Sequence, residues 1–139
     1  MASFVGTRTR RGAALLEMAL VLPLLMLILF GIIEYGWLFL KAQQINNACR
    51  QGARVGSLYG SGAGDVEAAV LNALTMVNMG ESGYTLTFVP ADPSDMESGE
   101  ALTVSISVPY PNILAIGVPF IPVPGTLQAE VVMAKEAAP

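Results

Sequence analysis

A long apolar segment near the N-terminus constrains the fold of this chain more than any other feature. Between Met18 and Leu40 the only charged residue is Glu34, and most of the others are large aliphatic or aromatic residues. As an α-helix this segment would be about 35 Å long, enough to cross a hydrocarbon core of about 30 Å. We therefore predict a membrane-spanning helix.

The charged residues are distributed unevenly around this segment. Arg8, Arg10 and Arg11 precede Gly12 without any acidic residue, whereas the rest of the chain holds four basic and eleven acidic residues, a net charge of −7. Positive residues beside a membrane segment favour the cytoplasmic side, so these three arginines predict an N-terminus inside and an exported C-terminal part. An acidic exported part without a basic patch disfavours nucleic-acid binding.

Composition limits what the remaining residues can do. The chain has 139 residues, of which 53% are hydrophobic, so beyond the membrane helix there is room for one small domain. It has no histidine and a single cysteine, Cys49, and we find no phosphate-binding loop or nucleophile motif. We predict no enzyme, cofactor, metal site or small-molecule substrate. Metal-dependent stabilisation or hydrolysis by the exported domain would revive an enzyme or metal-binding module.

Three residues within the apolar segment lack a large side chain or a backbone donor. Pro23 is expected to bend the helix, and Gly31 and Gly36 leave room for another helix to approach closely. Because proline and glycine are common in membrane helices, the two glycines can equally be ordinary components of the span.

The end of the apolar segment has the composition of a membrane interface. Tyr35 and Trp37 are aromatic residues suited to the far membrane surface, and Lys41 follows just outside it. At this level the Glu34 carboxylate can reach water, and we assign no chemistry to it.

Helical spacing continues beyond the membrane segment. Small residues recur every three or four positions up to Gly56, which predicts that one long helix enters the exported domain. Cys49 lies on this small-residue face, and we interpret it as a buried small hydrophobe. After a glycine-containing break, Asp65 is an expected N-cap, and apolar spacing then predicts a short helix to about Met79, stopped by Gly80.

The C-terminal half alternates between apolar and polar residues. This period of two predicts strands over residues 84–88 and 102–108 and from Thr126 to about Met133. Three such strands suggest an antiparallel sheet packed on the second helix or on the upper part of the first. The fold class is therefore α+β: a long membrane helix, a second short helix and about three strands.

Two connections remain between these elements. Residues 91–100 are acidic but lack the spacing of a calcium loop, and are interpreted as a solvated turn. Residues 109–125 carry five prolines, many apolar residues and no charge. Their apolar side chains must be buried by the core, by a partner or by the membrane. This candidate partner surface comprises Ile113, Leu114, Ile116, Val118, Phe120 and Ile121.

The first half of the chain resembles a known family. Gly12-Ala-Ala-Leu-Leu-Glu17, the following ALVLPLLMLILFGIIEYG and the later NNACRQGAR together resemble the TadE-like minor pilins, or pseudopilins, of the tight-adherence (Tad/Flp, type IVc) pilus. The resemblance covers Gly12 to Arg54. Met18 follows Glu17 where major Flp pilins usually have tyrosine, and the exported domain is longer than theirs, which favours a minor subunit.

The resemblance implies processing and assembly. A prepilin peptidase facing the cytoplasm would cut between Gly12 and Ala13, and the mature protein would sit in the bacterial inner membrane with a periplasmic domain and bind other pilins. Glu17 would neutralise the new N-terminal ammonium of a neighbouring subunit, because an unpaired charge at the membrane boundary is costly. Alternatively, Glu17 simply complements the positive end of the helix dipole.

We therefore expect a leader over residues 1–12, a transmembrane and extended helix over 13–58 and a periplasmic α+β domain over 59–139. The expected function is pilus assembly for surface adherence. An unprocessed single-span scaffold of a secretion machine is the alternative.

Overall fold

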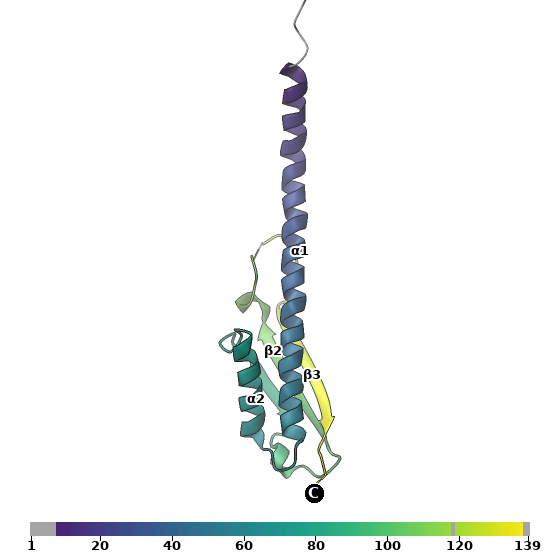
Figure 1. Cartoon of the computed structure of the whole chain (residues 1–139), viewed down its shortest axis with the longest axis vertical. Coiled ribbons are helices and arrows are strands. Elements are labelled where there is room, and N and C mark those ends of the chain that lie inside the picture. Colours follow the sequence, from purple (N-terminus) through teal and green to yellow (C-terminus); the bar gives the residue numbers. More distant parts are fainter. Residues whose placement is uncertain (1–7, 118, 138–139) are drawn as a thin grey trace, which may run out of the picture.

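The computed structural model describes residues 8–117 and 119–137, and it places a small α+β head around one end of a long helix. The element order is α1, α2, β1, a short 3-10 helix η1, β2, a second 3-10 helix η2 and β3. Figure 1 shows that roughly the first half of α1 projects beyond the head, while the second half lies against α2 and the sheet. The predicted α+β class is confirmed.

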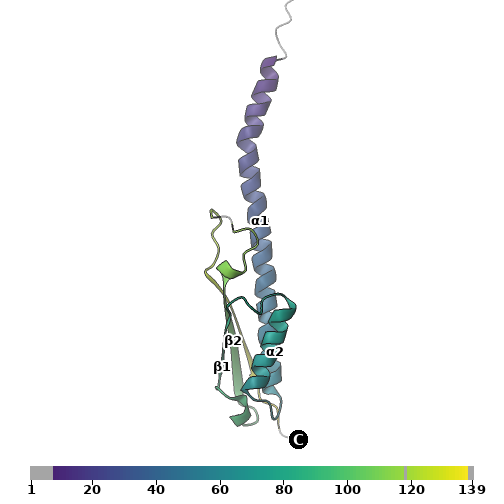
Figure 2. The ribbon, with the colours of Figure 1, turned by 90° about the vertical axis from the view of Figure 1, so that its left-hand side faces the viewer.

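Helix α1 runs without interruption from Arg8 to Ser57. Pro23 lies inside it, and the helix continues through this position because a single missing donor is tolerated in a long helix. Figure 2 shows a gentle curve in the upper half of α1, the half that contains Pro23. This agrees with the expected bend.

The second half of α1 is packed through its smallest residues. Ala48, Cys49 and Ala53 are buried in the core of the head, as the small-residue face predicted. A Cβ atom at Gly52 would come within 2.5 Å of Val70 Cγ2, a distance that real contacts do not reach. Only a helix with small residues here allows α2 and the sheet to approach α1 so closely.

Helix α2 spans Ala63–Met76 and packs along α1. It begins two residues before the expected cap at Asp65, since Gly62 occupies the N-cap and the Asp65 carboxylate accepts a hydrogen bond from Gly62 N at 3.0 Å. It also ends before Gly80, because Asn78 takes a left-handed conformation (φ 56°) and terminates the helix. The predicted helix is confirmed, but both of its ends were misplaced.

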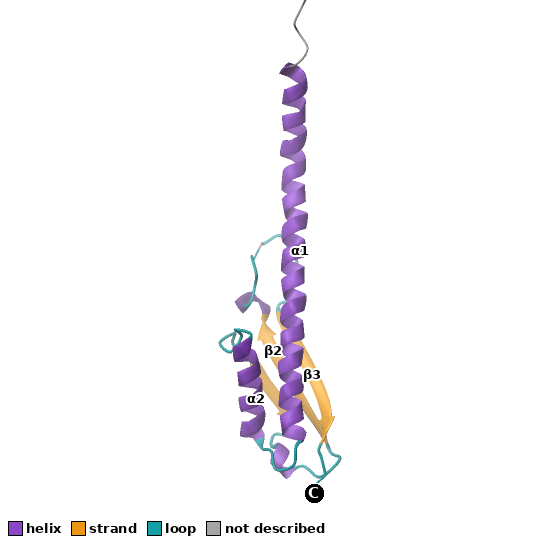
Figure 3. Cartoon of the chain, in the orientation of Figure 1, coloured by secondary structure: helices purple, strands orange, loops and turns teal. Residues whose placement is uncertain are grey.

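The sheet is antiparallel in the order β1-β2-β3, with β1 at Thr85–Val89, β2 at Ala101–Pro109 and β3 at Thr126–Ala134. Leu86 pairs with Ile106, and Ile106 also faces Ala129, so the apolar alternation of the strands is in register. The inner face of the central strand β2 consists of Leu102, Val104, Ile106 and Val108, all buried. Figure 3 shows the sheet behind α1, the helix on which it chiefly packs.

The end of α1 is held by the end of β3. Lys135, itself buried, donates from Nζ to the carbonyl oxygens of Gly56 at 3.1 Å and Ser61 at 3.4 Å. The backbone N–H of Glu136 donates to Ser57 O at 2.8 Å. A cation is favourable at a helix C-terminus, where carbonyl groups lack intrahelical partners. These bonds join the C-terminal end of α1 to the end of β3.

The acidic connection between β1 and β2 contains η1, Pro93–Asp95. The carboxylate of Asp92 accepts a hydrogen bond from Ser94 N at 3.0 Å, and this bond lowers the pKa of that carboxyl. Pro93 and Met96 are buried, so the connection is anchored on the core and is not wholly solvated as expected.

Candidate functional site

The membrane helix

The first half of α1 has the surface of a membrane span. Every described side chain from Gly12 to Leu29 is exposed, and most are large and aliphatic. Among the described residues, the Gly12–Ser57 part of α1 is the one helix long and apolar enough to cross a membrane, and none of its most apolar window is buried. In a soluble protein such a surface would be covered, so the exposure is consistent with a lipid environment.

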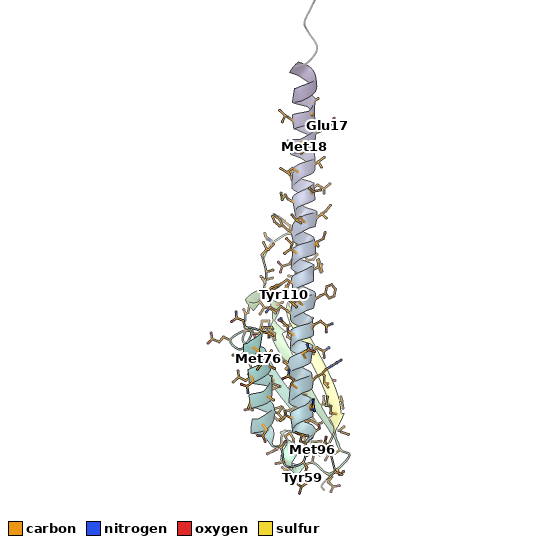
Figure 4. The ribbon with its side chains drawn as sticks, in the orientation of Figure 1. Glu17, Met18, Tyr59, Met76, Met96 and Tyr110 are labelled. Carbon is orange, nitrogen blue, oxygen red and sulfur yellow. The ribbon has the colours of Figure 1, made fainter. Side chains whose placement is uncertain are left out.

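Glu17 lies near the N-terminal end of this exposed half, beside Met18 (Figure 4). Its side chain is exposed. Gly12 and Ala13 also lie within α1 and are exposed. The arginines expected to set membrane orientation belong to the first turn of α1, but the side chains of Arg8, Arg10 and Arg11 lie outside the described residues.

The expected packing positions in the span are open within a single chain. A Cβ atom at Gly31 or Gly36 would have no neighbour within 4 Å. These glycines therefore do not serve packing inside the head, unlike Gly52. They leave room for a second helix to approach.

The Glu34 clamp

Glu34 is the most unexpected residue of the helix. Only 1% of it is exposed, so the expectation that its carboxylate reaches water is wrong. The proline-rich loop, residues 109–125, covers it. Oε1 accepts hydrogen bonds from Tyr110 Oη at 2.8 Å and Ala115 N at 3.4 Å, and Oε2 from Ile116 N at 3.0 Å and Gly117 N at 3.3 Å.

The geometry of the loop explains how one carboxylate receives three backbone donors. The successive N–H groups of Ala115, Ile116 and Gly117 all point to this carboxylate, and Gly117 then takes a left-handed conformation (φ 71°) that redirects the chain after them. Such a concave group of amides binds an anion, here the Glu34 side chain. The four neutral donors compensate for the removal of the carboxylate from water.

Two neighbours of Glu34 bind the rest of the loop. Tyr35 Oη donates to Pro122 O at 2.7 Å, and Trp37 Nε1 donates to Ile113 O at 2.6 Å. We call Glu34, Tyr35 and Trp37 the Glu34 clamp. At about 100° per residue, Tyr35 and Trp37 point to opposite sides of Glu34 and together cover roughly 160° of the helix surface. The loop therefore wraps around α1 at this level.

Tyr110, at the start of η2 (Tyr110–Asn112), is the largest fully buried side chain of the head. Burial raises the pKa of its phenol, and the adjacent Glu34 carboxylate raises it further. The phenol thus stays protonated and remains a donor to Glu34 over the physiological range. It links the loop, the sheet and α1.

Lys41 is also part of the head rather than a free charge outside the membrane. It is buried, its Nζ donates to Val77 O at 3.2 Å, and it lies 4.8 Å from the centre of the Trp37 ring. Val77 is the C-cap of α2, so Lys41 supplies the cation that a helix C-terminus favours. The sequence predicted a membrane interface at these aromatic residues and this lysine, and the structure adds that they bind α2 and the loop.

The expected partner surface divides into two parts. Ile113 and Ile121 are buried against the head. Leu114, Ile116 and Phe120 are 36%, 47% and 82% exposed. Val118 lies outside the described residues. Packing against the head therefore explains the burial of Ile113 and Ile121, but it does not cover Leu114, Ile116 and Phe120.

Relation to known families

The fold fits a single-pass membrane protein: one long apolar helix carries a small α+β head at its C-terminal end. The family model described as "TadE-like protein" matches residues 12–54, which confirms the resemblance over this segment. The match covers less than half of the chain and includes the exposed half of α1, the Glu34 clamp and the small-residue face through Ala53. It suggests a protein associated with the Tad pilus, and this family is not an enzyme family. Neither a curated protein nor a solved structure matches the chain.

Proposed function

We propose that this protein is a minor pilin of a Tad/Flp-type pilus. A prepilin peptidase removes residues 1–12, the exposed half of α1 anchors the mature chain in the bacterial inner membrane, and the head lies in the periplasm. The observation that carries the proposal is the TadE-like match, which begins at Gly12 and extends along α1 into the head. The chain acts by helix packing and by its head in assembling a pilus for surface adherence.

Glu17 is the proposed pairing residue. It is an exposed carboxylate on an otherwise apolar surface, and such a group is costly in a membrane or a helical stack unless it is paired. Cleavage after Gly12 would create an ammonium group on Ala13, one turn away along the helix. Pairing of Glu17 with the Ala13 ammonium of a neighbouring subunit would neutralise both charges.

The open positions on the span support close packing between subunits. Gly31 and Gly36 have free space where a Cβ atom would lie, and large aliphatic side chains surround them. Small residues let helix backbones approach each other within a membrane. Gly31 and Gly36 lie about 140° apart around α1, and we propose that other pilins contact α1 at each of these two positions.

The N-terminal sequence and intact mass of the protein from its native membrane test the proposal. We expect a chain that starts at Ala13, and a chain retaining the leader when the prepilin peptidase is deleted. Gly12→Lys should block both the size reduction and pilus formation, whereas Gly6→Lys, the same substitution within the leader, should block neither. A start at Met1 or Ala2 with the peptidase present would reject processing and favour an unprocessed scaffold.

A further inference from the structure

The proline-rich loop is fixed at one level of α1, and that level is the end of the apolar span. The Glu34 clamp binds the loop through five backbone positions: Ile113, Ala115, Ile116, Gly117 and Pro122. Residues 13–33, immediately before the clamp, would be about 31 Å long as a helix, which matches a hydrocarbon core. The loop thus lies where the membrane surface is expected.

The loop also reaches toward the span. Figures 1 and 2 both show it as the part of the head that rises furthest along α1. Phe30 and Gly31, one turn before Glu34, are half-buried, whereas the described side chains before them are exposed. The head therefore overlaps the last turn of the apolar segment.

The chemistry of the loop suits an apolar environment. Leu114, Ile116 and Phe120 are exposed to different degrees, and no charged residue occurs between Glu100 and Glu130. The N–H groups of Ala115, Ile116 and Gly117 are bound to Glu34, while Pro119 and Pro122 have none. Placing these groups in lipid would leave few backbone donors unsatisfied.

We propose that Leu114, Ile116 and Phe120 form a foot that inserts into the outer interface of the lipid bilayer beside α1. The occupant is lipid because the foot continues the apolar surface of the span and lies at its end. With two attachments, the span and the foot, the head is held at a set height and rotation on the membrane. The proposal requires that α1 spans a bilayer, and it is independent of cleavage after Gly12.

Fluorescence of the full chain in vesicles tests the proposal. Phe120→Cys carries an environment-sensitive nitrobenzoxadiazole label, and Tyr59→Cys carries the same label as a matched control. Tyr59 is an aromatic residue that is 64% exposed at the opposite end of the head (Figure 4). Cys49 is buried, and wild-type protein treated with the reagent measures any labelling there.

The vesicles contain phosphatidylethanolamine with a minority of phosphatidylglycerol, with or without a nitroxide near the headgroup end of an acyl chain. We expect the label at position 120 to be at least about fivefold less accessible to aqueous iodide than the label at 59. We also expect the lipid nitroxide to quench it, independently of the protein-to-lipid ratio. Circular dichroism checks that both labelled variants are folded.

Equal iodide quenching at the two positions would overturn the proposal. Protection at 120 without quenching by the lipid nitroxide would also overturn it, and if that protection increased with the protein-to-lipid ratio, a second copy would be the occupant.

Discussion

The two halves of α1 belong to one uninterrupted helix, yet they differ in which side chains they expose and which they bury. The first half exposes large side chains such as Leu20 and Leu25 on every face, and none of its most apolar window is buried. The second half buries its smallest residues, such as Ala53 and Gly56, against α2 and the sheet. Large apolar residues suit a fluid surrounding that adapts to them, whereas a rigid neighbour of fixed shape requires small residues.

The same contrast applies to the two carboxylates of the helix. Glu17 is exposed, so its interactions are set by the surroundings of the chain. Glu34 is enclosed by hydrogen-bond donors from the loop of residues 109–125. Glu34 lies near the boundary between the halves. At Glu34 the helix changes from an exposed apolar segment to a part of the head.

The largest effect is expected from enlarging the small-residue face. At Gly56 a Cβ atom alone would lie 2.5 Å from Leu102 Cδ2 and 2.8 Å from Val66 Cγ2. Gly56→Leu should therefore destabilise the head by more than about 3 kcal/mol, measured by urea unfolding of the full chain in detergent. Gly36→Leu, whose Cβ meets open space, should change stability by less than about 0.5 kcal/mol. Similar losses at both positions would refute the contrast between the closely packed small-residue face and the open positions of α1.

Removing the clamp carboxylate should have the next largest effect. Glu34→Ala deprives a buried tyrosine and three backbone N–H groups of their acceptor, and should cost about 2–3 kcal/mol. Hydrogen exchange should become faster at the amides of Ile116 and Gly117. Glu17→Ala is the matched control: we expect unchanged exchange and stability in the single chain, but loss of pilus incorporation. Unchanged protection of both amides in Glu34→Ala would show that the loop does not depend on the carboxylate.

A smaller loss is expected at the end of α1. Lys135→Met keeps the length and apolar stem of the side chain but removes the ammonium group that binds Gly56 O and Ser61 O. The cost should be about 1.5 kcal/mol in the same unfolding measurement. Glu136→Ala should have little effect, because the contact of Glu136 with Ser57 uses its backbone N–H. If Lys135→Met were as stable as wild type, the ammonium would contribute nothing as a cap.

The smallest effect, about 1 kcal/mol at neutral pH, is expected for Tyr110→Phe, which removes one hydrogen bond to Glu34. Burial and the Glu34 carboxylate raise the pKa of Tyr110 above its ordinary value of 10. The protonated phenol therefore stabilises the fold below about pH 10, and this contribution is lost as the pH rises further. Unfolding measured from pH 8 to 11 should show a steeper alkaline loss in wild type than in Tyr110→Phe. Parallel profiles would contradict this assignment.

Local patterns predicted most of the fold. The long apolar segment, the small-residue face and the three alternating strands each follow from interactions between nearby residues, and the structure confirms all three elements. The ends of α2 were misplaced because Asp65 binds Gly62 from inside the first turn and Asn78, rather than Gly80, adopts the left-handed conformation.

The clamp was not predicted, although its signals were present. A carboxylate and two aromatic side chains at the end of an apolar segment, together with an uncharged loop rich in prolines, are consistent with a membrane interface as well as with a loop-binding site. Formation of the loop-binding site depends on contacts between residues about 80 positions apart, such as Glu34 with Ile116. Periodicity and composition carry no information on such contacts.

The sequence by itself determined that one long helix carries an apolar span and a small α+β head, because hydrophobic period and charge act locally along the chain. Only the tertiary structure decided that Glu34 is buried, that Lys41 and Lys135 cap helices, and which loop residues remain exposed. A buried charge is stable only where distant donors or acceptors converge on it, and the packing of the whole head sets that convergence.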